Sequence, residues 1–139
     1  MGGPAPLRQA ALARLEIVAD TYLSVGTPVQ IAAPALLARR AELQAPLAQR
    51  VRANLDCLRG ALAGTAGTVL DVEGGWSAVI QVPATRSEEA WAAELLDQDG
   101  VLVHPGFFFD FPREAFLVVS LLTEPANFSE GTSRLRAHL

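Results

Sequence analysis

The sequence has 139 residues, of which half are hydrophobic and 19% are charged, and its formal net charge is −4 at pH 7. This length is typical of one domain, which we expect to span residues 1–139. The acidic balance argues against a nucleic-acid partner, and no segment approaches the ~20 apolar residues that a membrane span requires. We therefore expect a cytoplasmic protein. The lone Cys57 agrees, because one thiol forms neither an internal disulfide nor a metal cluster.

The chain contains no lysine, since all 11 basic residues are arginines. Without that amine no side chain can form a Schiff base, which excludes lysine-based covalent catalysis and a P-loop lysine. The two imidazoles, His104 and His138, have no partner at the spacing of a metal site or a catalytic triad. We predict no catalytic residue and no metal site in this chain.

Two helices are predicted at the start of the chain. Apolar residues recur every three or four positions over residues 7–23, which indicates an amphipathic helix. Residues 1–6 before it are expected to be disordered or to follow a cut made inside a longer gene. Gly26 should end this helix in the left-handed conformation, and the hydroxyl of Thr27, ahead of Pro28, should cap a second helix. That helix is apolar on more than one side, so we expect it to be buried.

A long third helix is predicted over residues 41–62, where leucine and valine repeat on one face. Pro46 fits best in a first turn, so the helix should begin near Ala45 and leave residues 39–42 as a turn. Glycines then release the chain.

The following stretch changes from helical to strand-like patterns. Strands are expected at residues 68–72 and 78–82, joined across Gly74-Gly75. Ser87 should cap a helix that runs to Gly100, with Glu88 and Glu89 as solvated acids near its positive end.

A pair of apolar strands is expected around an aromatic loop. The first, Val101–Val103, should stop at His104-Pro105-Gly106, and the second, Phe116–Leu122, should be an inner strand because both its faces are apolar. Residues 107–111 between them hold four phenylalanines. This loop either folds onto its own core, or places one or two rings at a ligand cleft or a partner surface.

A last helix should follow Glu124-Pro125. The chain thus predicts an α+β fold, in which three N-terminal helices precede a β-β-α-β-β-α unit with a small sheet of about four strands and helices on one face.

Three segments together resemble a known family. They are residues 12–30, with a Thr-Pro pair followed by glutamine, the turn Gly74-Gly75-Trp76, and residues 101–109, with Val-Leu-Val-His-Pro-Gly. In this order they resemble the C-terminal part of class I/II aminotransferases, which are pyridoxal-phosphate enzymes of fold type I. The resemblance runs from about Gly3 to the end of the chain.

The resemblance implies a small domain that closes over a cofactor bound by a larger, preceding domain. That domain and its lysine are missing here, so we expect no cofactor-binding residue in this chain and no activity from it alone. The parent enzyme would transfer an amino group between an amino acid and a 2-oxo acid, as a homodimer. By the same resemblance, Gly74, Gly75 and Trp76 line the substrate pocket, while Ser24, Gly26 and Thr27 lie near the partner subunit's site.

The sequence departs from the family at one position. An arginine that binds the substrate carboxylate usually stands two residues before the serine of the last strand, and here that residue is Val118. Arg113 lies in a predicted turn, and we do not assign the role to it.

Two alternatives from other classes stay open. The chain could be a freestanding ligand-binding or interaction module that uses the Gly74 turn and the 107–111 loop. It could also be a dimerisation unit that self-associates through the apolar surface from Tyr22 to Ile31.

Overall fold

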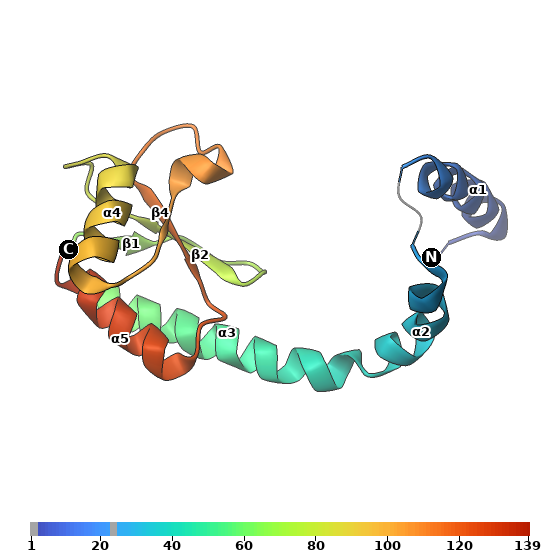
Figure 1. Cartoon of the computed structure of the whole chain (residues 1–139), viewed down its shortest axis with the longest axis horizontal. Coiled ribbons are helices and arrows are strands. Elements are labelled where there is room, and N and C mark those ends of the chain that lie inside the picture. The colour runs from blue at the N-terminus through green and yellow to red at the C-terminus, as the bar shows by residue number, and fades with distance from the viewer. Residues whose placement is uncertain (1–2, 23–24) are drawn as a thin grey trace. The chain divides into compact units, whose positions relative to one another are not determined.

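The computed structural model describes residues 3–22 and 25–139 (Figure 1). The chain divides into two compact units, Met1–Leu43 and Gln44–Leu139. That these units form one domain over residues 1–139 stays a prediction. None of the helices in the described part of the chain has both the length and the apolar character needed to cross a lipid bilayer.

The first unit consists of α1 (Ala5–Thr21), α2 (Thr27–Ala38) and the first residues of α3 (Arg40–Leu62). Neither α1 nor α2 has a buried residue, so the expectation of a buried second helix is wrong. Ile31 is 76% exposed and Tyr22 79%. The large apolar side chains of α1 and α2 are therefore mostly exposed within the described part of the chain.

Two details of the helix ends correct the sequence prediction. Gly26 is the N-cap of α2 with φ −57°, so it does not adopt the left-handed conformation expected of it, and Thr27 is the first helical residue rather than a cap. The expected turn over residues 39–42 and the expected helix start near Ala45 are also wrong, because only Arg39 separates α2 from α3, which begins at Arg40 and includes Pro46. Proline removes the hydrogen bond to the carbonyl four residues earlier, and that residue, Glu42, is exposed, so water can replace the bond.

The second unit is organised on an antiparallel sheet with strand order β1-β2-β4-β3. These strands are β1 (Thr68–Val69), β2 (Ser77–Gln81), β3 (His104–Pro105) and β4 (Phe116–Ser120). β4 is an inner strand, as expected. Residues 101–103 are not a strand, because the ladder begins only at His104. Pro105 is tolerated there because β3 is an edge strand.

Three helices cover one face of this sheet. Ile80 of β2 is paired with Leu117 of β4, so both side chains share a face. They belong to one buried cluster with residues of α3, of α4 (Glu88–Asp99) and of α5 (Pro125–Arg136), among them Leu58, Trp91 and Phe128. The predicted α+β class is therefore confirmed.

Polar contacts fix the helices to the strands that they cover. The buried side chain of Asn54, in α3, donates through Nδ2 to the carbonyls of Leu121 at 2.9 Å and Thr123 at 2.8 Å. α5 lies beside the C-terminal half of α3 (Figure 1), where Cys57 Sγ is 3.8 Å from Thr132 Oγ1. Cys57 is half-buried.

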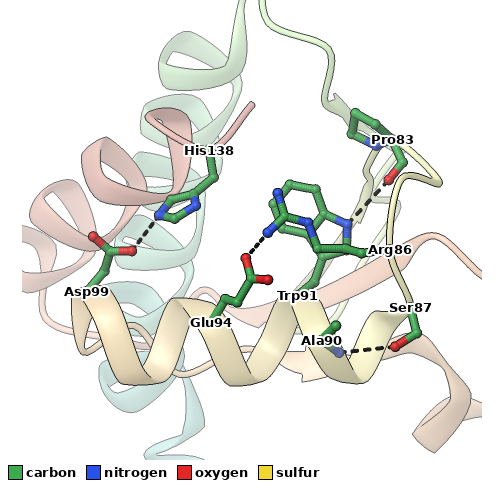
Figure 2. Close-up of polar contacts among 8 residues, drawn as sticks. All are labelled: Pro83, Arg86, Ser87, Ala90, Trp91, Glu94, Asp99 and His138. Atoms are coloured by element: carbon green, nitrogen blue, oxygen red, sulfur yellow. Dashed lines mark hydrogen bonds and ion pairs between the residues drawn. The ribbon is translucent and has the colours of Figure 1, made fainter.

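Helix α4 is anchored at both ends (Figure 2). Ser87 Oγ accepts a hydrogen bond from the Ala90 amide at 3.2 Å, and Gly100 ends the helix with φ +64°, so the predicted cap and the predicted helix end are both confirmed. Near the C-terminal end, Asp99 Oδ2 lies 2.5 Å from His138 Nε2. His138 therefore fastens the C-terminus of the chain to α4.

The largest buried side chain, Trp91, has one polar and one charged contact (Figure 2). Its indole Nε1 donates to the Pro83 carbonyl at 3.3 Å. The Arg86 guanidinium lies 4.1 Å from the ring centroid and pairs with Glu94. The indole is thus held in the core with its N–H satisfied and its ring covered by a cation.

Candidate functional site: a groove beside the glycine turn

The glycine turn between β1 and β2 has a conformation that only glycine adopts readily. Gly75 has φ +78°, and a Cβ built at Gly74 or Gly75 would meet no atom within 4 Å. The backbone angle, and not crowding, therefore selects glycine at position 75. The carbonyl of Trp76 accepts from the Leu121 amide at 2.7 Å, which attaches the turn to the end of β4.

Helix α3 supplies the opposite side of an open groove. Leu47, Val51 and Leu55 are spaced four residues apart, so they form one stripe along the helix. The groove between this stripe and the turn has a volume of about 750 Å³. Its lining is mainly apolar and consists of Gln44, Leu47, Ala48, Val51, Arg52, Leu55, Val72, Glu73, Gly74, Gly75, Trp76 and Leu122.

The groove has few charges and a large exposed aromatic ring. Trp76 is 63% exposed. Arg52 and Glu73 are the charged lining residues, and neither takes part in an ion pair formed by the described part of the chain. A flat indole and an unpaired guanidinium beside apolar side chains suit a small molecule with an apolar body and an acid group.

The sequence predicted only one side of this groove. Gly74, Gly75 and Trp76 were expected in a substrate pocket, and the structure brings them together on the groove wall. Sequence reasoning missed the α3 side of the groove, including Arg52. The signal was present, because the apolar repeat of α3 includes Leu47 and Val51, which precede the buried residues of the helix.

The second predicted group of site residues lies in the first unit. Gly26 and Thr27 form the start of α2, where the Gly26 carbonyl accepts from the Val29 amide at 3.0 Å. Ser24 lies outside the described residues. The assignment of these three residues to a partner subunit's site stays a prediction.

Val118 is in no position to hold a substrate carboxylate. Its side chain is 4% exposed and lies in β4 between its register partners Val79 and His104. Arg113 lies with its guanidinium 5.3 Å from the centroid of the Phe116 ring. A substrate carboxylate would have to be bound by a cationic side chain at a position other than 118.

The aromatic loop of the sequence is only partly folded onto the core. Its first residues form a short 3-10 helix, η1 (Gly106–Phe109), and Phe107, Phe108 and Phe109 are 47%, 63% and 51% exposed. The interpretation of a loop covering its own core is therefore wrong for these three rings. Only Phe111 packs inward, with its centroid 5.1 Å from that of Phe116.

The residues of this chain do not fit pyridoxal phosphate. The aldehyde of that cofactor needs a lysine amine, and the sequence has none. Arg52 is the one cationic side chain among the groove residues, which is a poor set of donors for a phosphate.

The fold recurs in aminotransferases of known structure. A candidate aminotransferase from Silicibacter pomeroyi is 31% identical, covering 91% of this chain and 35% of that chain, with a TM-score of 0.75. A PLP-dependent aminotransferase from Streptococcus suis is 19% identical, and the match covers 88% of this chain and 33% of that chain with a TM-score of 0.73. Aspartate aminotransferase from Thermotoga maritima has 20% identity, coverage of 94% and 33%, and a TM-score of 0.70. This chain has the fold of a segment of the PLP-dependent aminotransferases.

The size of that segment agrees with the resemblance found in the sequence. The chain spans about a third of the length of these aminotransferases, which is consistent with their C-terminal domain. Neither the family models nor the curated proteins gave a significant match.

Proposed function

We propose that this chain is the C-terminal small domain of a PLP-dependent aminotransferase. The parent enzyme transfers an amino group between an amino acid and a 2-oxo acid, and the rest of the protein supplies the lysine and the cofactor site. One observation carries the proposal. This chain has no lysine, and it has the fold of about one third of the length of enzymes whose chemistry requires a lysine amine. On this account the chain alone is inactive.

In the parent enzyme the groove forms one wall of the substrate pocket. Gly75 shapes the turn, Trp76 packs against the apolar part of the substrate, and the α3 stripe excludes water on the opposite side. The segment containing Ser24, Gly26 and Thr27 lies at the partner subunit's site in a homodimer. The acid group of the substrate is bound by a cation other than one at position 118.

A reconstitution experiment tests this proposal. The chain is produced together with the lysine-bearing remainder of the protein, as one polypeptide or as two, and formation of 2-oxo acid from an amino acid is measured with PLP. Activity is expected only when both parts are present. In the assembled enzyme, Trp76→Ala should raise KM for the amino donor about tenfold, and Leu102→Ala, outside the groove, should not change it.

The openness of the groove supports a second candidate function, a freestanding ligand-binding or interaction module derived from this domain. The exposed Trp76 and the buried Trp91 differ in their surroundings, so a ligand entering the groove would change the emission of Trp76 alone. A ligand bound at micromolar concentration by the chain alone, together with no activity on reconstitution, would favour the module.

A further inference from the structure

A buried carboxylate stands where the sequence predicted a solvated one. Glu88, the first residue of α4, is 2% exposed. Its Oε2 accepts a hydrogen bond from the Phe107 amide and its Oε1 one from the Phe116 amide, both at 2.8 Å. None of the ion pairs formed by residues 3–22 and 25–139 includes Glu88. Two amide dipoles and the positive end of α4 therefore compensate its charge.

Capping does not explain this burial. The N-terminus of α4 already has a cap in Ser87, whose hydroxyl accepts from Ala90. Both amides bonded by Glu88 lie far along the chain from it. They belong to the first residue of segment 107–115 and to the residue that directly follows that segment, so one side chain ties both ends of the segment together.

The segment between these two amides is strained. Asp110 has φ +54° and Ala115 has φ +83°, and these are the non-glycine residues with positive φ in the described part of the chain. A positive φ costs of order 1–3 kcal/mol in alanine and persists only when its surroundings hold it, whereas aspartate adopts the left-handed region more readily. Ala115 directly precedes Phe116, whose amide is bonded to Glu88.

Gly106 makes the close approach of the carboxylate possible. A Cβ at this position would lie 2.8 Å from Glu88 Oε1, 2.7 Å from Phe111 Cδ2 and 2.9 Å from Phe116 Cβ. The Phe111 ring is fixed by packing and the Phe116 Cβ is fixed by the backbone of β4, so a larger residue than glycine would not fit at position 106. Glycine at position 106 therefore allows the Glu88 carboxylate to reach the amides at both ends of the segment.

We propose that Glu88 is the latch of segment 107–115: its carboxylate accepts from the amides at both ends of the segment and thereby holds the strained backbone in this conformation. Glu88 is a positioning residue in this proposal, because it acts through the backbone of the segment. Loss of the carboxylate releases the segment while the core stays folded.

Amide hydrogen exchange of the full chain tests the latch. In Glu88→Gln one carboxylate oxygen becomes an NH₂ group, so at least one of the two amides loses its acceptor and faces a donor. The amides of Phe107 and Phe116 should exchange about tenfold faster or more. Those of Leu70 and Phe128, which bond to carbonyls outside the segment, should keep their rates. Glu89→Gln, at the exposed neighbour, should change none of these rates.

Two results would overturn the proposal: unchanged exchange at Phe107 and Phe116, or equal acceleration at all four amides, which marks general destabilisation.

A second variant applies if Glu88→Gln does not fold. Ala115→Gly removes the strain of a positive φ, so with the latch intact the Phe116 amide should exchange about threefold more slowly. Ala84→Gly, at an exposed turn without positive φ, should give no such slowing. A rate that rises or does not change in Ala115→Gly would contradict the latch.

Discussion

The two units of the chain have similar helical patterns but opposite burial. α1 and α2 have no buried residue, although leucine, isoleucine and valine repeat along them. In the second unit the same kind of repeat in α3 puts Leu58 and Leu62 at 0% and 3% exposure. Spacing of apolar residues therefore specifies a helix and its apolar face, while burial of that face depends on what the rest of the fold provides.

The sharpest way to break this comparison is a matched pair of leucine substitutions. Leu58→Ala, in the core of the second unit, should lower the free energy of unfolding by about 2–5 kcal/mol through lost burial and a cavity. Leu15→Ala, at a residue 52% exposed in α1, should change it by about 0.5 kcal/mol or less. Urea denaturation measures both. Equal losses would show that α1 is packed against a core.

The second unit also has a buried side-chain amide, that of Asn54, which tests how much buried polar contacts contribute to its stability. Asn54→Ala leaves the carbonyls of Leu121 and Thr123 without their donor, so unfolding should become easier by about 1–3 kcal/mol. Gln49→Ala, at an exposed position of the same helix, is the control and should have no measurable effect. A neutral Asn54→Ala would mean that water reaches the end of β4.

A smaller effect is expected at the edge of the core. Arg86→Ala removes the cation over the Trp91 ring and the ion pair with Glu94. Because Arg86 and Glu94 are partly exposed, the loss should be about 0.5–1 kcal/mol and should shrink in high salt. Arg59→Ala, at an exposed arginine of α3, should leave stability unchanged at any salt concentration.

The smallest effect on stability is predicted in α2. Pro34 lies inside this helix, where it removes a hydrogen bond. Pro34→Ala should increase helical circular dichroism without changing the denaturation midpoint of the second unit, because α2 contributes no buried residue. A shift of that midpoint would couple the two units. The matched Ala35→Pro should lower the helical signal instead.

The sequence predicted the regular parts of this fold well. The caps Ser87 and Gly100, the inner strand β4 and the glycine turn follow from local rules about hydroxyls, β-rich runs and positive φ. The α+β class follows from the order of those elements. These features depend on residues close together in the chain.

The features that the sequence could not predict depend on contacts between distant residues. Glu88 follows a capping serine, so it was interpreted as a solvated acid, but its partners are amides 19 and 28 residues away. Arg52 joins the groove only because the turn at Gly75 lies opposite α3. The shift of β3 onto His104-Pro105 depends on its edge position, which no local pattern reveals.

The central claim is that PLP-dependent transfer of an amino group requires a lysine amine, which this chain does not have. It is tested most directly by incubating the purified chain with PLP and a panel of amino acids and measuring 2-oxo acid formation. The account predicts no product above the rate of free PLP. Catalytic turnover by the chain alone would contradict it.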